Sequence, residues 1–311
     1  MRVEGEDLKG SYKGIDFLSR LADGEQIPVG RSAVIIGGGN TAIDCTRNLL
    51  RMGCENVYIV YRRTRNEMPA NEVEIDAAEE EGVQFQFLAA PVRVIGDEKG
   101  HATHLEYLKM ELGEPDASGR RRPVPIDGSE TLIEADMVIT AIGQSPEISF
   151  TEGIMEQVME LKTTRWNTID VDPATLQSNI PHLFAAGDAA TGPSLVVSAI
   201  GGGRRAARSI HQYVMGQEVN ANPNELNKDL IAETIFDQVP GVVKSRRAAM
   251  PELSIKDRMD SFIEVDQVLS EEDALGESNR CLYCCLTCYN PDQAYEDQVS
   301  IKVLRKQSEV V

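Results

Sequence analysis

Apolar residues between Ser32 and Leu88 fall into short runs separated by segments with helical spacing. The runs SAVII, NVYIVY and VQFQFL have the length and the β-branched or aromatic composition of buried strands. Apolar positions in NTAIDCTRNLL and NEVEIDAAEEEG recur every three or four residues, which is typical of amphipathic helices. Strands that alternate with helices in this way predict an α/β fold with a Rossmann-like parallel sheet.

The pattern changes at Pro91, where strand-like segments follow one another without helices. PVRVIG, THLEYLKMEL and TLIEA are separated by DEKGH and by a longer stretch rich in glycine and proline. This order predicts an antiparallel meander inserted before the last strand of the parallel sheet, DMVITAIG. Further along, we expect a short strand in NTIDVD, a buried strand in PHLFAAGD and a helix from SLVVSAI that ends at Gly216.

The turn after the first apolar run has the pattern G-x-G-x-x-A, formed by Gly37, Gly38, Gly39, Asn40, Thr41 and Ala42. In a strand–turn–helix context, the first glycine permits a tight turn and the next lets a pyrophosphate approach the backbone. The alanine allows close helix–strand packing, and the helix N-terminus directs N–H groups at the anion. The pattern predicts a dinucleotide site; a tight turn without a ligand is the alternative.

The residues after the second run determine which dinucleotide is expected. An acidic residue there would accept a hydrogen bond from the adenosine ribose and favour NAD, but the chain has YRRTR at residues 61–65. Guanidinium groups suit a ribose 2′-phosphate, so Arg62 and Arg63 predict NADPH. A solvated basic turn is the alternative.

A second match to G-x-G-x-x-A lies at residues 201–206. The turn at Gly187 and Asp188 leaves little room for a strand before it, and Ala206 and Ile210 continue an apolar helical face. We therefore expect a helix interior here, not a second nucleotide loop.

Composition and charge narrow the class of protein. The 311 residues are 41% hydrophobic and 26% charged, and the net charge of −19 argues against nucleic-acid binding. No stretch approaches the ~20 apolar residues of a membrane span, and no signal segment opens the chain. A cytoplasmic location without a membrane span is the expectation.

Four of the six cysteines lie within residues 281–288. Cys281, Cys284 and Cys288 form C-x2-C-x3-C, and Cys285 is the additional thiol. An iron–sulfur cluster ordinarily takes four thiolates, so we predict a 4Fe-4S cluster with Cys285 or a partner's cysteine as the fourth ligand. A zinc site, whose cysteine pairs are usually farther apart, and free or redox-active thiols are the alternatives.

Several motifs together resemble the glutamate synthase small-subunit family of flavoproteins. They are GEDLKG, GGGNTAIDCTR, VYRRTRNEMPA, EEGVQF, AIGQSP and FAAGDAATGPSLVVSAIGGGRRAA. The resemblance implies an NADPH domain inserted into an FAD-binding domain, whose first FAD loop would precede Met1 and be absent. We expect residues 1–30 to be a linker or the end of an FAD-domain segment, residues 31–146 the NADPH domain, residues 147–220 the C-terminal part of the FAD domain, and residues 221–311 an extension with the cysteines.

The resemblance also implies roles for single residues. The glycine turn would hold the NADPH pyrophosphate, and Gly143 belongs to the predicted cofactor site. Gly187 and Asp188 would approach the ribityl and pyrophosphate region of FAD, although Asp188 as a cap of the following turn is the alternative. Amides near Leu195 and Val196 would face the pyrimidine edge of the isoalloxazine. No catalytic side chain is demanded, because nicotinamide passes a hydride to the flavin and the protein supplies orientation.

The resulting hypothesis is an NADPH-dependent FAD oxidoreductase subunit that passes electrons through an iron–sulfur centre to a redox protein partner. The cysteines depart from the resemblance, because the family's small subunits have theirs near the amino terminus. The rival hypothesis is a nucleotide-binding and docking module, or a fragment of a larger flavoprotein, without turnover of its own. A thiol reductase that uses the cysteine cluster is a third possibility.

Overall fold

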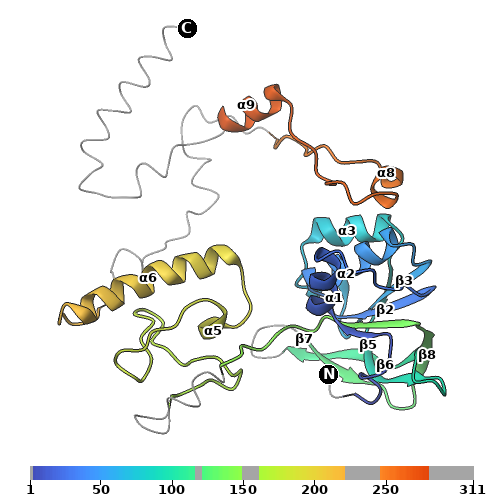
Figure 1. Cartoon of the computed structure of the whole chain (residues 1–311), viewed down its shortest axis with the longest axis horizontal. Coiled ribbons are helices and arrows are strands. Elements are labelled where there is room, and N and C mark those ends of the chain that lie inside the picture. The colour runs from blue at the N-terminus through green and yellow to red at the C-terminus, as the bar shows by residue number, and fades with distance from the viewer. Residues whose placement is uncertain (1–2, 116–120, 149–160, 221–245, 280–311) are drawn as a thin grey trace. The chain divides into compact units, whose positions relative to one another are not determined.

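The computed structural model describes residues 3–115, 121–148, 161–220 and 246–279. The chain divides into two units, Met1–Leu230 and Ile231–Val311. The first unit contains two β-sheets and most of the described helices, and the described part of the second, residues 246–279, contains two helices joined by extended chain (Figure 1).

Five parallel strands form the first sheet, in the order β1-β9-β2-β3-β4. Their bounds are β1 Ser11–Lys13, β2 Ser32–Ile36, β3 Asn56–Tyr61, β4 Gln84–Phe87 and β9 Met137–Thr140. The predicted parallel sheet is confirmed. The sequence pattern missed β1, which precedes residue 31 but pairs with β9 in this sheet, because three residues at an edge show no periodicity.

Three helices cover one face of the parallel sheet (Figure 1): α1 Gly14–Ala22, α2 Asn40–Arg51 and α3 Glu72–Glu80. Each of the three central strands places a fully buried isoleucine at the same level of the sheet: Ile35, Ile59 and Ile139. α2 contacts both α1 and α3, and its Ile43 and Leu49 are fully buried as well. The helical spacing in NTAIDCTRNLL therefore marked the side of α2 that packs into the core.

The second sheet is antiparallel. Its long strand β6, Ala102–Pro115, pairs with β5 Ala89–Gly96, β7 Arg121–Pro125 and β8 Thr131–Glu134. This arrangement confirms the predicted meander before β9. The sequence pattern missed β7, because Pro123 and Pro125 lack the N–H groups of a regular strand and are tolerated only where pairing is one-sided.

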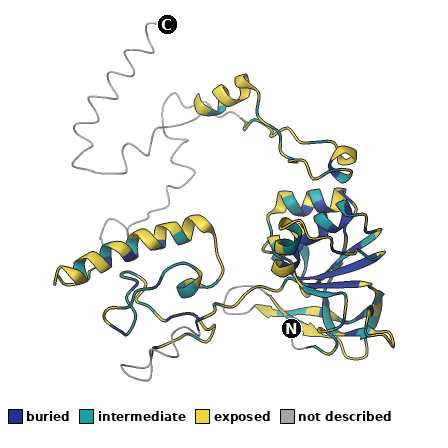
Figure 2. Ribbon diagram, in the orientation of Figure 1, coloured by how far each residue is buried: buried dark blue, intermediate teal, exposed yellow. Residues whose placement is uncertain are grey.

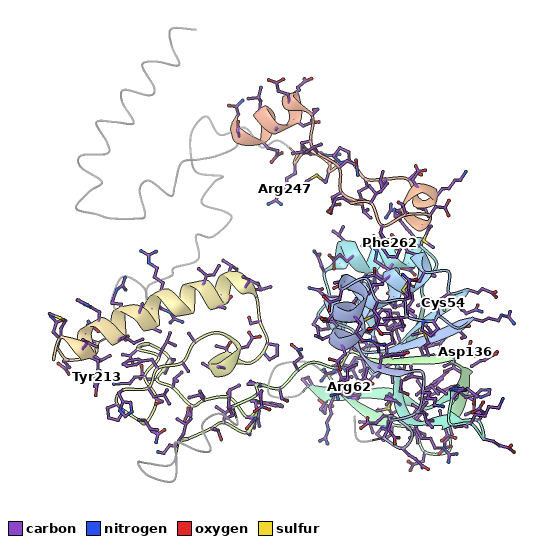
Figure 3. All side chains as sticks on the ribbon, in the orientation of Figure 1. Cys54, Arg62, Asp136, Tyr213, Arg247 and Phe262 are labelled. Carbon is purple, nitrogen blue, oxygen red and sulfur yellow. The ribbon has the colours of Figure 1, made fainter. Side chains whose placement is uncertain are left out.

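A buried apolar layer joins the two sheets (Figure 2). It contains Val34, Ile36, Val60 and Val138 from the parallel sheet and Val94, Leu105 and Tyr107 from the antiparallel sheet. Asp136, just before β9, fixes the start of β2, because its carboxylate accepts hydrogen bonds from the amides of Arg31 at 2.7 Å and Ser32 at 3.0 Å (Figure 3). β2 is thus held both by the apolar layer and by hydrogen bonds at its first residue.

Residues 161–220 contain the helices α5 Asp188–Thr191 and α6 Val196–Val214. α6 confirms the predicted long helix, ends just before Gly216 and includes residues 201–206, so the second glycine match is a helix interior. The predicted strands in NTIDVD and PHLFAAGD are wrong. Isolated bridges, such as Gln177 with Phe184, replace them, because each segment pairs within a local turn and not along a neighbouring strand.

The second unit contains α8 Ile255–Met259 and α9 Glu271–Asn279. Backbone hydrogen bonds join the chain on either side of α8, including Leu253 N–H to Val265 O at 2.9 Å. Among the described helices of the whole chain, none has the length and apolarity needed to cross a membrane.

Candidate functional site

The glycine turn connects β2 to α2, and its first two glycines are required by their neighbours. Gly37 has φ +141°, and a Cβ atom there would lie 2.2 Å from the carbonyl oxygen of Ala141. A Cβ atom on Gly38 would lie 2.7 Å from the ring of Tyr61. Neither position can hold a side chain, because the turn lies directly against the end of β9 and the last residue of β3.

Gly39 is different from the other two glycines. Its φ of −94° is open to any residue, and the nearest atom to a Cβ there would be Pro69 Cγ at 3.9 Å. Gly39 is also the N-cap of α2, where unpaired backbone N–H groups point out of the helix. The missing side chain therefore leaves space over the helix start, which suits a bound anion.

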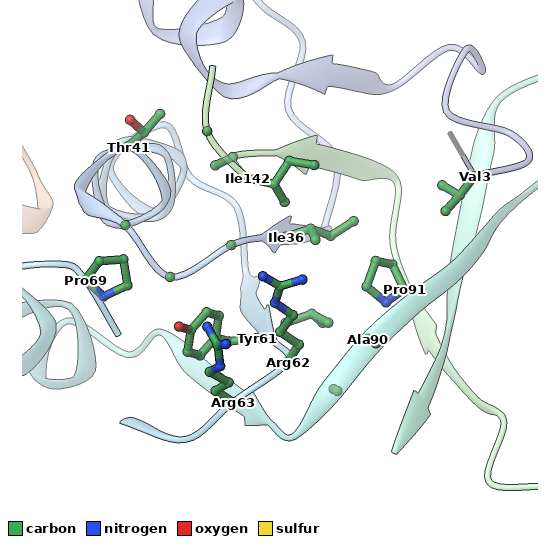
Figure 4. Close-up of a pocket in the computed structure, with 17 residues that line it drawn as sticks. Val3, Ile36, Thr41, Tyr61, Arg62, Arg63, Pro69, Ala90, Pro91 and Ile142 are labelled. Atoms are coloured by element: carbon green, nitrogen blue, oxygen red, sulfur yellow. The ribbon is translucent and has the colours of Figure 1, made fainter. Parts of the chain in front are cut away.

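A cavity of about 550 Å³ lies beside this turn, at the carboxyl ends of β2, β3 and β9 (Figure 4). Its lining includes these predicted site residues: Gly37, Gly38, Gly39, Thr41, Arg62, Arg63 and Gly143. No acidic side chain is among the described lining residues. Parallel sheets bind ligands at this edge, and the balance of charge here favours an anionic ligand.

The three arginines after β3 have different environments. Arg62 is exposed, lines the cavity, and its side chain has no hydrogen bond or ion pair within the described ranges (Figures 3 and 4). Arg63 is buried, and its Nε donates to the carbonyl oxygen of Arg121 at 2.9 Å. Arg65 forms ion pairs with Asp76 and Glu79 on α3. Arg62 is therefore the arginine whose charge is available to a ligand in the described structure.

Two predicted residues of the turn do not line the cavity. Ala42 is fully buried between helix and sheet, as its predicted packing role requires. Asn40 begins α2, and its Oδ1 accepts a hydrogen bond from the backbone N–H of Asn71 at 2.9 Å. Its side-chain oxygen thus contacts the protein backbone.

Sequence reasoning missed several lining residues. Tyr61 and Pro69 lie beside the glycine turn, and Ile142 follows β9 at the same edge. Pro91 joins them from the start of β5. The MPA shortly after YRRTR was a usable signal for Pro69, but its position beside Gly39 depends on the fold.

The second predicted group lies in residues 161–220 and does not line this cavity. Gly187 has φ +61°, and a Cβ there would lie 3.2 Å from the Cβ of Ala199 on α6. Asp188 Oδ1 accepts a hydrogen bond from the amide of Ser194 at 3.3 Å, which is the capping interaction considered as an alternative. Leu195 and Val196 are 66% and 77% exposed. Asp188 is exposed as well, whereas Gly187 is half-buried.

The cysteines fall into two classes. Cys281, Cys284, Cys285 and Cys288 lie outside the described residues. Cys45 and Cys54 are buried free thiols, and burial raises the pKa of Cys45 to about 12 and that of Cys54 to about 11. Thiols held in the protonated form are poor nucleophiles and poor metal ligands, so these two serve as packing residues.

Comparison with known proteins gives a family match over most of the chain. The model of the pyridine nucleotide-disulphide oxidoreductase family matches residues 1–203. The chain is 39% identical to the NADPH-Fe(3+) oxidoreductase subunit beta of Geobacter sulfurreducens, over 91% of this chain and 46% of that protein. It is 43% identical to the glutamate synthase [NADPH] small chain of Azospirillum brasilense, over 64% of this chain and 40% of that protein.

These relatives confirm the resemblance predicted from the motifs. The chain spans about half the length of the curated relatives it matches. Among solved structures, FprA of Mycobacterium tuberculosis in complex with NADPH has a TM-score of 0.54 at 18% identity, over 73% of this chain and 64% of that one. At this identity the likeness concerns the fold.

Proposed function

The chain belongs to the pyridine nucleotide-disulphide oxidoreductase family, and from that premise we propose that it takes electrons from NADPH. In this proposal, the electrons pass through FAD to an iron–sulfur centre and then to a protein acceptor. The observation that supports it most directly is the cavity beside Gly39, where an open helix start and the uncommitted guanidinium of Arg62 lie on one lining.

The NADPH part of the proposal assigns two ends of the cavity. The space over Gly39 would accept the pyrophosphate, because a side chain there would fill the position that the ligand needs. Arg62 would pair with the ribose 2′-phosphate, since guanidinium forms strong charge-assisted hydrogen bonds with phosphate. Arg63 would stabilise the arginine end of the cavity through the hydrogen bond from its Nε to the carbonyl oxygen of Arg121.

The flavin part rests on residues 161–220. Bound FAD would supply the exchange between two-electron transfer from nicotinamide and one-electron transfer to a metal centre. In this proposal Gly187 and Asp188 lie beside its ribityl and pyrophosphate region. The close approach of the 186–188 turn to Gly202 of α6 supports a fixed position for these residues. Leu195 and Val196 are exposed residues at the start of α6, and the amides there would offer positive potential to the flavin.

The metal centre and the partner rest on sequence and on relatives. The spacing of Cys281, Cys284, Cys285 and Cys288 supports an iron–sulfur cluster in the second unit. The names of relatives, such as subunit beta and small chain, describe parts of assemblies. They support a redox protein or subunit as the acceptor for this chain.

One observation favours the second candidate function, a nucleotide-binding module without turnover of its own. Leu195, Val196 and Val197 at the predicted flavin surface are all more than 60% exposed. A flavin held there would need further protein to cover it, because bound cofactors are largely buried. In that case the chain alone would bind NADPH but would not retain FAD.

A visible absorption spectrum of the anaerobically purified chain, recorded before and after NADPH is added, separates the two functions. A working relay shows flavin bands that bleach with NADPH above a broad iron–sulfur shoulder. The same sample assayed for iron and FAD gives the stoichiometry of each group. A colourless sample that still binds NADPH supports the module, and a sample that binds no NADPH contradicts both functions.

A further inference from the structure

The segment of residues 64–71, which we call the bridging segment, follows the arginines and leads to α3. Its start is fixed by Glu67, whose Oε2 accepts hydrogen bonds from the backbone N–H of Thr64 at 3.0 Å and from its hydroxyl at 2.5 Å. The hydroxyl of Tyr61 donates to the carbonyl oxygen of Glu67 at 2.7 Å. These bonds give the segment one conformation relative to the end of β3.

The end of the bridging segment lies on the glycine turn. Ala70 N–H donates to the carbonyl oxygen of Gly38 at 3.1 Å, and Asn71 N–H donates to Asn40 Oδ1 at 2.9 Å. Pro69 is the nearest neighbour of the open position on Gly39. The bridging segment therefore connects the arginine end of the cavity to the turn at its other end.

Asn40 makes the side-chain contact in this connection. It is the first residue of α2, it does not line the cavity, and its oxygen is committed to Asn71. An asparagine at this place can hold the helix start at a fixed position relative to the bridging segment. A ligand at Gly39 would then meet backbone N–H groups that are already in place, which lowers the cost of ordering on binding.

We propose that Asn40 is a positioning residue that acts through the backbone of Asn71 to hold the glycine turn for the pyrophosphate of a dinucleotide. The inference rests on the proposed nucleotide site. It replaces direct contact between Asn40 and NADPH, the role implied by family resemblance, with a contact inside the protein. Because NADPH and NADH share the pyrophosphate, the loss of this contact affects both nucleotides equally.

The backbone of Asn71 permits a sharp test. Its φ is −64°, the value that proline imposes, and its side chain makes no capping hydrogen bond to α3. Asn71→Pro therefore removes the N–H donor with little strain at that residue, whereas Asn71→Ala keeps the donor and removes the side chain. The Kd of Asn71→Ala is the reference against which that of Asn71→Pro is measured.

Calorimetric titration of the full chain with NADPH and with NADH gives the Kd values. We expect Asn40→Ala and Asn71→Pro each to raise the Kd for both nucleotides roughly threefold, which is the effect of losing one exposed hydrogen bond. The double variant should be no weaker than either single variant, because both remove the same bond. Arg62→Ala is the contrasting variant, since it should raise the Kd for NADPH and leave the Kd for NADH unchanged.

Two further readouts separate positioning from general damage. The melting temperature of each variant shows whether it folds. Amide hydrogen exchange at Asn71 should accelerate in Asn40→Ala and be restored in Asn40→Asp, which keeps an acceptor oxygen. If Asn40→Ala weakens binding but Asn71→Pro matches its reference, Asn40 contacts the nucleotide directly and the inference is wrong. A wild-type chain that binds neither nucleotide would instead overturn the proposed function.

Discussion

At the scale of single residues, the three glycines of the turn have three different reasons to be glycine. Gly37 has a positive φ and the carbonyl of Ala141 against it. Gly38 lies on the ring of Tyr61. Gly39 has neither constraint, so the protein's own packing does not explain its lack of a side chain. The proposed ligand would account for it, which makes Gly39 the most informative position of the turn.

Alanine at Gly39 should therefore change nucleotide affinity, whereas alanine at Gly37 should change stability. Gly39→Ala should leave the melting temperature unchanged and weaken NADPH binding about tenfold, or ~1.4 kcal/mol, because a methyl group enters the proposed pyrophosphate position. Gly37→Ala should lower the free energy of unfolding by about 3 kcal/mol, through its positive φ and the clash with Ala141. Thermal unfolding and calorimetric titration check the pair. If the nucleotide affinity of Gly39→Ala is unchanged, the pyrophosphate does not bind at this turn.

The sequence pattern identified part of the cavity lining, the glycine turn and the arginines after β3, but not which partner each side chain bonds. Local spacing was enough for the glycine turn and for arginines after β3, because the pattern is contained in one strand–turn–helix unit. The bond from Arg63 to Arg121 and the bond from Asn71 to Asn40 join segments far apart in sequence. Such partners depend on tertiary packing, which no local pattern encodes.

At the scale of elements, a buried carboxylate joins α2 to α3. The side chain of Glu81, at the C-cap of α3, is fully buried and accepts two hydrogen bonds from Arg47 of α2, at 2.9 and 2.7 Å. Arg51 lies 3.8 Å from the same carboxylate. A carboxylate between two arginines at a helix–helix contact fixes how α3 lies beside α2.

Loss of that carboxylate should be costly. Glu81→Gln should lower the free energy of unfolding by about 3 kcal/mol, because two poorly solvated guanidinium groups lose their counter-charge. The matched control is Glu55→Gln, which breaks the exposed pair with Arg31 and should cost less than ~0.5 kcal/mol. Denaturant titration of both variants measures the difference. Equal costs would contradict the structural role given to Glu81.

The prediction of elements succeeded where the hydrophobic pattern is long and failed where pairing is decided elsewhere. α2, α3 and α6 and the strands β2 to β6 follow their sequence patterns. β1 is short, and its partner, β9, is remote in sequence. β7 contains two prolines and pairs with β6. NTIDVD and PHLFAAGD have strand composition, yet they pair within local turns. Composition indicates what can become a strand, and available partners determine what does.

At the scale of the whole molecule, the buried thiols make stability depend on pH. In the folded chain the pKa of Cys45 rises from its ordinary 9.0 to about 12, and that of Cys54 to about 11, because burial disfavours the thiolate. Above pH 9 the unfolded chain loses these protons first, so unfolding becomes more favourable as the pH rises. The stabilising effect is complete below pH 9 and is lost toward the folded pKa values.

Denaturant titrations from pH 8 to 10.5 measure this dependence. Each thiol should contribute a decline of up to about 1.4 kcal/mol per pH unit above pH 9. Cys45→Ala removes one contribution, so its stability should fall less steeply over this range than that of the wild type. Identical slopes for the two proteins would assign the alkaline loss to other groups.

The position of β9 in the sheet has a consequence for synthesis. β9 lies between β1 and β2, although it follows both by more than a hundred residues, as the 104-residue separation of Ser32 and Asp136 illustrates. Before Met137–Thr140 leaves the ribosome, β1 has no neighbour and one edge of β2 is unpaired. A growing chain therefore exposes an apolar strand edge until its sheet is closed from the middle, and this interval is when a chaperone would be of most use.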